Sequence, residues 1–379
     1  MSETGANQPI QILDIRDSPW HDGPGRTIIE VASGLKAQGI DIRIASFVSD
    51  NSTDSDYLEK AREKGLECIE IKETKTFDSA IVDQIIALHQ TSPFTIIHSH
   101  DLRSNVYGLL AARKLRLPII ATMHGWVANS IKRKAIMVLG NLMLSYLFDA
   151  VITVSNSAKQ RLDSYLPTAR LMTIHNTLAT QDYKHIDGGT FRRSLNIPKE
   201  TPLLAKIGRL SPEKRQDQLI LASKQLVEDG YDFKVLFIGV GPEESRLRLL
   251  SEQLGIADFF IFTGFIEDML PVYSEIDLVV QTSSTEGLPN VILEAMLMRV
   301  PVVATDVGGT SEIVNSSEVG RLIPPENESV LVSALKSFLD APEVYRNKLD
   351  KAEQRIRDSF DSDKRLEKMA ALYRDVNGQ

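Results

Sequence analysis

The chain has 379 residues, of which 42% are hydrophobic, so it can bury two ordinary cores. Its formal net charge of −8 at pH 7 argues against nucleic-acid binding through a general basic surface. A single cysteine, Cys68, cannot build a disulfide framework within the chain, which fits a reducing compartment.

The sequence shows neither a secretion signal nor a membrane-spanning segment. The first residues lack a basic region followed by an apolar core. The longest apolar stretch, residues 135–148, contains Gly140, Asn141 and Ser145 and is shorter than the about 20 residues that a span requires. We therefore expect a cytoplasmic protein, with the inner face of a membrane as its alternative location.

Short apolar, β-branched runs alternate with longer amphipathic segments along the whole chain. The strand candidates of the first half are residues 11–15, 40–47, 66–71, 94–100, 118–124, 149–155 and 171–176. Those of the second half are residues 203–210, 233–241, 259–265, 277–283, 301–306 and 320–325. Apolar strands joined by helices are typical of parallel sheets covered on both faces. The sequence therefore predicts an α/β protein with two doubly wound, Rossmann-like domains.

The break between the two series falls in a polar stretch that contains Gly188, Gly189 and Pro198. We place an N-terminal domain at residues 1–180, a linker at 181–200 and a C-terminal domain at 201–355. Residues 356–379 are predicted to form a helix that packs back toward the N-terminal domain. Because ligands bind at the carboxyl ends of strands in such sheets, we expect the two domains to face a common cleft.

Two glutamates, Glu286 and Glu294, have seven residues between them in the stretch STEGLPNVILEAM. Pro289 and Asn290 are typical of a helix start, and apolar residues follow them at helical spacing. A helix N-terminus attracts anions through its unpaired N–H groups and its dipole. The two carboxylates therefore mark either a ligand site or an ordinary helix start with a solvated neighbour.

Further polar and glycine residues follow other predicted strands. In KIGRLSPEK, Arg209 and Lys214 would clamp a diphosphate, although a solvated basic turn explains the same residues. Between the first strand and the first helix, Gly23 and Gly25 would let backbone N–H groups approach phosphate oxygens. Neither a complete dinucleotide fingerprint nor a P-loop is present.

Four histidines lie at the ends of predicted strands: His98, His100, His124 and His175. Imidazole is a zinc ligand, but no HExxH motif or cysteine accompanies these residues. We therefore expect no metal site.

These motifs together resemble a known family. GRLSPEK, TSSTEGLPNVILEAM and PVVATDVGG are similar to the corresponding segments of the family 4 retaining glycosyltransferases, which have the GT-B fold. The resemblance extends over nearly the whole chain through GPG, IIHSHD, TMHG, VITVSNSAK, TIHNTL, IGVGP and FTGF. Its most specific element is the E-x7-E spacing of Glu286 and Glu294.

The resemblance implies a role for each matching residue. Glu286 would hydrogen-bond hydroxyls of the donor sugar, Glu294 would bind the ribose, and Arg209 and Lys214 would hold the pyrophosphate. His124 would reach the donor sugar from the N-terminal domain. We accordingly predict His124, Arg209, Lys214 and Glu286 as catalytic residues.

The predicted donor site contains residues from five loops and one helix start. Its members are Gly23, Gly25, Arg209, Lys214, Gly239, Gly264, Phe265, Glu286, Gly287, Leu288, Pro289, Asn290 and Glu294. The turn at Gly264 and Phe265 is similar to the segment whose backbone meets the nucleotide base in the family.

The implied reaction transfers a sugar from a nucleotide diphosphate sugar to an acceptor hydroxyl with retention of configuration. UDP is the favoured nucleotide and GDP the second. A saccharide or a lipid-linked saccharide is the expected acceptor, as in bacterial-type polysaccharide or glycoconjugate synthesis, and no metal or other cofactor is expected. The alternatives are a glycoside hydrolase, a nucleotide-sugar 2-epimerase and a non-catalytic nucleotide-sugar-binding protein of similar fold.

The acceptor side is less specified by the sequence. His100, Trp126 and Asn176 are the candidate residues, and His175 stands where the family usually has proline. The segment from Ser130 to Phe148 combines an apolar face with three basic residues, Lys132, Arg133 and Lys134. It would either dock on anionic lipid or form a core helix with a solvated basic start.

Overall fold

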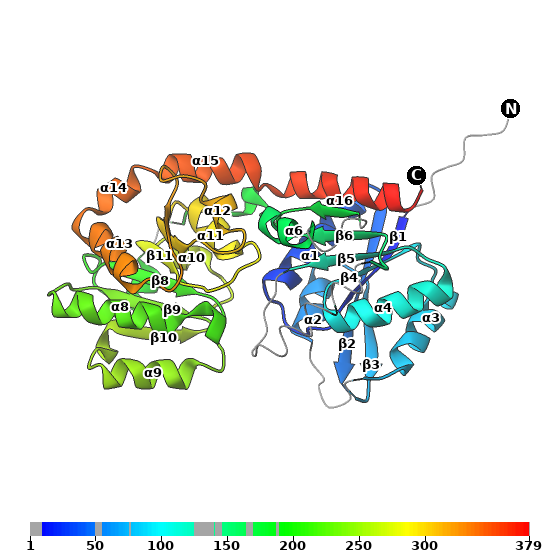
Figure 1. The fold of residues 1–379 in the computed structure, drawn as a ribbon, viewed down its shortest axis with the longest axis horizontal. Helices are drawn as coiled ribbons and strands as arrows, with labels where there is room; N and C mark the ends of the chain where they lie inside the picture. Colours follow the sequence, from blue (N-terminus) through cyan, green and yellow to red (C-terminus); the bar gives the residue numbers. More distant parts are fainter. Residues whose placement is uncertain are drawn as a thin grey trace. The chain divides into compact units, whose positions relative to one another are not determined.

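The computed structural model describes residues 10–49, 55–75, 77–124, 140, 146–163, 170–186 and 189–378 (Figure 1). The chain divides into two compact units: residues Met1–Asn176 with Asp363–Gln379, and residues Thr177–Ser362. Trp126, Lys132, Arg133 and Lys134 lie outside the described residues. Among the helices that the structure describes, none has the length and apolar character needed to cross a membrane.

The first unit is built on a seven-stranded sheet with the order β3-β2-β1-β4-β5-β6-β7. All its strand pairs are parallel. The strands are β1 (Ile10–Arg16), β2 (Ile40–Ser49), β3 (Cys68–Glu73), β4 (Ile96–Ser99), β5 (Ile119–Met123), β6 (Ala150–Thr153) and β7 (Leu171–Thr173). The strand order reverses between β1 and β4, which is the switch point where doubly wound sheets bind ligands.

Helices cover both faces of this sheet because successive strand residues point to opposite sides. On one face, Ile10 and Ile12 of β1 join a core with α1 (Gly23–Lys36), α2 (Asp56–Glu63) and α16 (Ser362–Val376). On the other face, Leu13 and Ile15 join a core with α3 (Ala80–Thr91), α4 (Leu102–Leu115) and α6 (Asn156–Asp163). The C-terminal helix α16 is therefore part of the first unit's core.

The second unit is built on a six-stranded sheet with the order β10-β9-β8-β11-β12-β13. All its strand pairs are parallel. The strands are β8 (Leu203–Ile207), β9 (Lys234–Ile238), β10 (Phe260–Gly264), β11 (Leu278–Gln281), β12 (Val302–Thr305) and β13 (Arg321–Ile323). The two sheets confirm the predicted α/β fold with two doubly wound domains.

One face of the second sheet packs against α8 (Gln216–Glu228), α9 (Glu244–Gln253), α13 (Glu328–Asp340) and α14 (Pro342–Arg346). Helix α11 (Asn290–Leu297) contacts β12, α12 (Thr310–Ile313) and α15 (Leu349–Ser359). Two shorter helices, α7 (Thr190–Ser194) and α10 (Leu270–Tyr273), contact each other. This places α11, with its predicted site residues, directly against the sheet.

Residues 189–200, which we predicted as part of a linker, are packed into the second unit. Arg192 of α7 is buried, and its guanidinium donates to the Glu275 carbonyl at 2.8 Å and to Asp277 Oδ2 at 2.5 Å. The second unit continues through α15 to Ser362, beyond our predicted end at residue 355. The polar, glycine-containing sequence suggested a linker, but the buried side chain of Arg192 anchors this segment to the second unit.

One prediction at a helix start was wrong, and a second was right to within one residue. Gly23 and Gly25 lie in the first turn of α1 rather than in the loop before it, because Asp22 caps the helix by accepting from the Gly25 N–H at 3.0 Å. Helix α11 begins at Asn290, and Pro289 occupies the N-cap position. The predicted helices themselves are present.

Candidate functional site

The loops at the carboxyl edge of the second sheet are tied together by their backbones. Four hydrogen bonds of 2.8 to 2.9 Å run between neighbouring loops: Gly208 N–H to the Ile238 carbonyl, Gly239 N–H to Gly264, Ser284 N–H to Glu213, and Gly309 N–H to Gly287. Backbone N–H and C=O groups are strong hydrogen-bonding groups, so these contacts fix the spacing of the loops. The predicted site residues in these loops therefore sit on a rigid platform.

Glycines make the close approach of these loops feasible, and two of them also have positive φ values. Gly239 has a φ of +134°, and a Cβ there would lie 2.2 Å from the Gly208 carbonyl oxygen. Gly308 has a φ of +57°, and a Cβ there would lie 2.0 Å from the Glu286 carbonyl oxygen. Gly239 belongs to the predicted donor site, whereas Gly308 was not among its predicted residues. Its role is to bring the loop after β12 against the backbone of Glu286.

The structure brings Lys214 and Glu286 into direct contact. Lys214 Nζ lies 2.8 and 2.9 Å from the two oxygens of Glu286, whose side chain is only 8% exposed. Burial by itself would raise the pKa of Glu286, but the charge and hydrogen bond of Lys214, together with Ser283 and Lys206, outweigh burial and lower it. Glu286 is therefore a carboxylate with two fixed oxygens, a strong acceptor for hydroxyl groups.

Two buried polar residues that sequence reasoning missed form a hydrogen-bonded chain that ends on Glu286. Gln281, the last residue of β11, donates from Nε2 to Glu286 Oε1 at 2.7 Å, and its own Oε1 accepts from Lys206 Nζ of β8. Lys206 is 1% exposed, and burial together with the charge of Lys214 lowers its pKa well below the usual value. The signal in the sequence is an isolated polar residue in each of two apolar strands, LLAKI and LVVQ.

Glu294 lies inside α11 and is 5% exposed. The hydroxyl of Tyr273, another residue that sequence reasoning missed, donates to Glu294 Oε2 at 2.7 Å. Leu288 and Pro289 are buried, and the buried Oδ1 of Asn290 has no hydrogen-bond partner among the described residues. The start of α11 therefore contains a buried acceptor as well as the N–H groups of its first turn.

Arg209 and Phe265 present their side chains to solvent. Arg209 is exposed, and among the described residues it has no carboxylate partner. Phe265 is 66% exposed and follows Gly264, whose φ is +72°. An exposed guanidinium and an exposed ring at this edge are available to a diphosphate and to a planar base.

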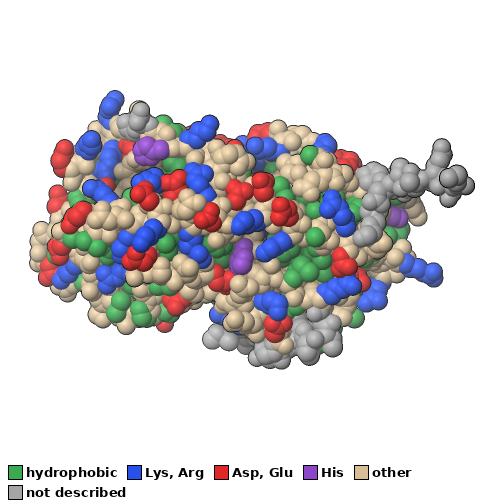
Figure 2. Space-filling view, turned by 90° about the horizontal axis from the view of Figure 1, so that it is seen from above, with side chains coloured by type: hydrophobic (Ala, Val, Ile, Leu, Met, Phe, Trp, Pro, Cys, Tyr) green, Lys and Arg blue, Asp and Glu red, His purple; other side chains and the backbone are tan. Residues whose placement is uncertain are grey.

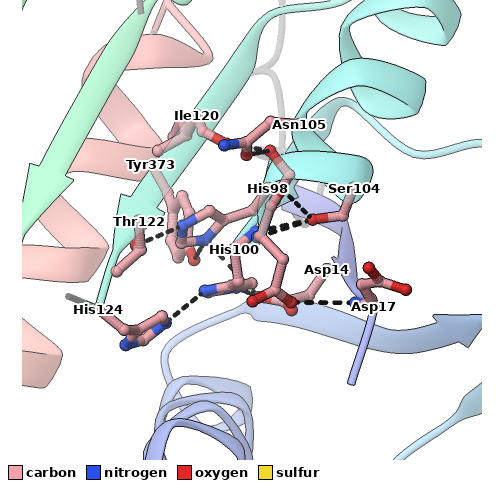
Figure 3. Close-up of polar contacts among 12 residues, drawn as sticks. Asp14, Asp17, His98, His100, Ser104, Asn105, Ile120, Thr122, His124 and Tyr373 are labelled. Atoms are coloured by element: carbon pink, nitrogen blue, oxygen red, sulfur yellow. Dashed lines mark hydrogen bonds and ion pairs between the residues drawn. The ribbon is translucent and has the colours of Figure 1, made fainter. Parts of the chain in front are cut away.

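The first unit contains a buried cluster of histidines at the carboxyl edge of its own sheet (Figure 3). His100, which follows β4, shares a hydrogen bond with Asp14 Oδ2 of β1 through Nε2 at 2.9 Å. Its Nδ1 shares another with His124 Nε2, after β5, at 2.9 Å. His98 makes separate hydrogen bonds to the Tyr373 hydroxyl (2.7 Å) and to Thr122 Oγ1 (2.8 Å). Adjacent strands β1, β4 and β5 thus align Asp14, His100 and His124 in a row.

Burial dominates the electrostatics of this cluster. It lowers the pKa of His98 and of His100 to about 3 and lowers that of His124 well below its usual value. Burial also raises the pKa of Asp14 to about 7, against the opposing effect of its cationic neighbours. At neutral pH the three imidazoles are therefore uncharged.

A metal ion is not needed to explain this cluster. Asp14, His98 and His100 each offer one ligand atom, and these atoms lie within 4.8 Å of one another. However, both ring nitrogens of His98 and both of His100 already have hydrogen-bond partners within the chain. The arrangement is that of a hydrogen-bonded network.

Gly23 and Gly25 lie next to an ion pair that sequence reasoning missed. Arg16, at the end of β1, is 2% exposed and bonds both oxygens of Asp22 at 2.7 Å. A Cβ on Gly25 would lie 2.5 Å from Arg16 Nη1. One structural reason for glycine at this position is therefore the room that Arg16 requires.

The acceptor-side candidates differ in what they contact. Both nitrogens of His100 are engaged inside the chain, as described above. Asn176 is 6% exposed, and its Oδ1 accepts from Arg365 of α16 at 3.0 Å. Trp126 lies outside the described residues. A direct contact between any of the three and an acceptor stays a prediction.

We predict that acid destabilises the first unit. The unfolded chain protonates His98 and His100 near pH 6.5, whereas the folded chain does so only near pH 3, so stability falls as pH drops through this window. Asp14 has the opposite effect between pH 3.8 and about 7: the folded chain binds a proton there that the unfolded chain does not, so this group raises stability as pH falls. The two histidines together outweigh the single aspartate. For each net proton that the unfolded chain binds in excess of the folded chain, the free energy of unfolding falls by about 1.4 kcal/mol per unit decrease in pH.

Urea unfolding at several pH values between 4 and 6.5 measures this effect. Both tryptophans of the chain, Trp20 and Trp126, fall within residues 1–176, so tryptophan fluorescence reports on the first unit. Asp14→Asn should make the loss on acidification steeper, since it removes the opposing group. A stability that is constant across this range in both proteins would contradict the prediction.

Side chains of both charge signs are mixed on the face of the molecule that Figure 2 shows. This agrees with the net negative charge and with the absence, on that face, of a continuous basic surface.

Comparison with known proteins agrees with this architecture. Residues 188–356 match the family described as "Glycosyl transferases group 1", and residues 21–182 match "Glycosyltransferase Family 4". The chain is 24% identical over 312 residues to N-acetyl-alpha-D-glucosaminyl L-malate synthase of Bacillus anthracis, covering 79% of this chain and 80% of that protein.

Two further similarities extend over almost the full chain. UDP-Gal:alpha-D-GlcNAc-diphosphoundecaprenol alpha-1,3-galactosyltransferase of Escherichia coli is 23% identical over 381 residues, 97% of each chain. The crystal structure of Anabaena HepE in complex with UDP and glucose superposes with a TM-score of 0.85 at 20% identity, covering 96% of this chain and 99% of that one. The chain therefore belongs to the family 4 type of glycosyltransferases and has the GT-B fold.

Proposed function

We propose that this glycosyltransferase moves a sugar from a nucleotide diphosphate sugar, with UDP as the favoured nucleotide, to a hydroxyl of a saccharide or lipid-linked saccharide. The configuration at the anomeric carbon would be retained. The observation that supports this most is the contact between Lys214 and Glu286 at the edge of the second sheet, close to the start of α11.

The chemistry of these residues suits an activated sugar. The fixed carboxylate of Glu286 would accept hydrogen bonds from sugar hydroxyls, and Glu294 would accept from the ribose. Lys214 and the exposed Arg209 would stabilise the negative charge that develops on the departing diphosphate. We infer that these cations and the N-terminus of α11 act in place of a metal ion, so that turnover is metal-independent.

The reaction would proceed on one face of the donor sugar. The bond between the anomeric carbon and the diphosphate oxygen breaks, the acceptor oxygen bonds to the same face, and the departing phosphate takes the acceptor's proton. In this scheme no side chain acts as a covalent nucleophile. The names of the relatives support both partners, since UDP and glucose bind HepE and the E. coli relative acts on a diphosphoundecaprenol-linked sugar.

A thermal-shift screen of UDP- and GDP-sugars, followed by turnover with saccharide and lipid-linked acceptors, tests the proposal. We expect one nucleotide sugar to raise the melting temperature and to be consumed only when an acceptor is present. The anomeric coupling constant in the product's NMR spectrum then reports retention, and added EDTA should leave the rate unchanged. Consumption without an acceptor, to free sugar or to an epimer, would contradict transfer.

A further inference from the structure

The histidine cluster of the first unit contains a row of hydrogen bonds that ends on a predicted catalytic residue. Asp14 Oδ2, His100 and His124 are joined by two contacts of 2.9 Å, as Figure 3 shows. Asp14 is 2% and His100 7% exposed, and both ring nitrogens of His100 are engaged within the row. The row therefore offers Asp14 and His100 a route to the donor through His124.

The row fixes where the imidazole protons lie. An ionised Asp14 only accepts, so His100 must carry its proton on Nε2 and present a lone pair on Nδ1. That lone pair must accept from His124, which therefore carries its proton on Nε2. The remaining nitrogen of His124, Nδ1, then also presents a lone pair. One carboxylate thus determines the tautomers of two neutral histidines.

The outer nitrogen of His124 is unused within the described part of the chain. Its Nδ1 is buried and has no hydrogen-bond partner among the described residues. A buried nitrogen without a partner is unfavourable, and a hydroxyl donor from a ligand would satisfy it. A sugar offers such hydroxyls.

We propose that Asp14 and His100 are positioning residues that hold His124 as the Nε2–H tautomer, so that its Nδ1 accepts a hydrogen bond from a hydroxyl of the donor sugar. This inference rests on the proposed function and on the role that the family resemblance implies for His124, which is to reach the donor sugar. The low pKa values of the histidines support it, because protonated imidazoles could not accept.

The charged and titratable groups around Asp14 are compatible with an ionised carboxylate. Arg16 of the same strand and Arg365 of α16 act on it as cations, and both lower its pKa. His98 Nδ1 lies 3.6 Å from Asp14 Oδ2 but is bonded to Tyr373. Tyr57 of α2 and Tyr373 of α16 are further titratable neighbours, and burial raises the pKa of each well above the usual value. The experiments below are best done at about pH 8, where Asp14 is ionised.

Nitrogen-15 NMR of the free protein tests the tautomer independently of turnover. The His124→Gln variant assigns the His124 signals by their loss. We expect an unprotonated Nδ1 and a protonated Nε2 in the wild type, and a shift toward the other tautomer in Asp14→Asn, whose amide can donate to His100. A protonated Nδ1 in the wild type, or an unaltered spectrum in the variant, would overturn the proposal.

A double-mutant cycle tests the path through His124. Asp14→Asn should lower kcat/KM by about tenfold, the loss expected for one hydrogen bond, and should have no further effect in a His124→Ala background. If Asp14→Asn does not fold, His100→Gln takes its place in the same cycle. If the losses in kcat/KM of the two single variants multiply in the double variant, Asp14 has a general structural role and the inference is overturned.

His98→Gln is the matched control, because it removes a buried imidazole beside the row but outside it. We expect it to reduce stability while leaving the His124 tautomer unchanged. A change of that tautomer in His98→Gln equal to the change in Asp14→Asn would count against the row as the cause. If the wild type transfers no sugar from any nucleotide donor, the proposed function fails, and the NMR spectra still decide whether Asp14 and His100 set the tautomer.

Discussion

Lys214→Ala should lower turnover on the correct nucleotide sugar by about 10²–10³-fold, the usual cost of removing one electrostatic contact to a developing charge. The variant loses an ammonium that would face the diphosphate. It also leaves Glu286, 8% exposed, without the ion-pair partner that lies 2.8 Å away. Glu286→Gln should have a comparable effect, because an amide cannot accept hydroxyl protons with both of its polar atoms.

Because Lys214 and Glu286 touch, their effects should not multiply. In the double variant Lys214→Ala with Glu286→Gln, neither a buried charge nor its partner remains, so the combined loss should be smaller than the product of the single losses. Arg215→Gln is the matched control: it removes the next cation of the same loop, whose guanidinium is paired with Asp217 and Glu326. Unchanged kcat/KM in Lys214→Ala, or an equal loss in Arg215→Gln, would refute the assignment.

The strands could be predicted because their signal is local. Each predicted apolar run overlaps a strand, and the parallel order follows from the helices between the runs. The residues at the strand ends were predictable for the same reason: Glu286, Lys214 and His124 each follow a strand and match a family motif. Their types and places were therefore available from the sequence.

The contacts between these residues were not available, because they depend on strand order. Lys214 meets Glu286, 72 positions later, because β8 lies beside β11 in the sheet. In the same way, Asp14 meets His100 because β1 lies beside β4. Sequence reasoning assigned His124 to the donor sugar and His100 to the acceptor side and set a zinc site aside, but it did not connect these histidines with Asp14. The signal that sequence reasoning overlooked was Asp14, because a carboxylate inside an apolar strand requires a polar partner nearby.

The start of α1 shows a different limit. A glycine pair between a strand and a helix suggests phosphate binding, and the structure gives Gly25 another reason to lack a side chain, namely the buried guanidinium of Arg16. Glycine suits both phosphate binding by the backbone and the close approach of the Arg16 guanidinium. Local sequence cannot separate them, because the arginine that fills the space lies at the end of the preceding strand.

Gly308→Ala should lower both activity and stability through the backbone of Glu286. At this position a Cβ would lie 2.0 Å from the Glu286 carbonyl oxygen and 2.7 Å from its carbonyl carbon. Backbone atoms cannot rotate away as a side chain can, so the loop after β11 must move. Displacement of a site by about 1 Å commonly costs about 10²-fold in rate. We expect a loss of that order in kcat/KM.

The conformational cost of alanine itself must be separated from this displacement. Gly308 has a φ of +57°, where a non-glycine residue costs about 1 kcal/mol. Gly255→Ala provides the control, since Gly255 has a φ of +69° but no atom within 4 Å of its Cβ position. Both variants should lower the melting temperature measured by circular dichroism, and only Gly308→Ala should lower kcat/KM. Equal kinetic losses in the two variants would assign the effect to stability, and wild-type kinetics in Gly308→Ala would show that the Glu286 loop tolerates movement.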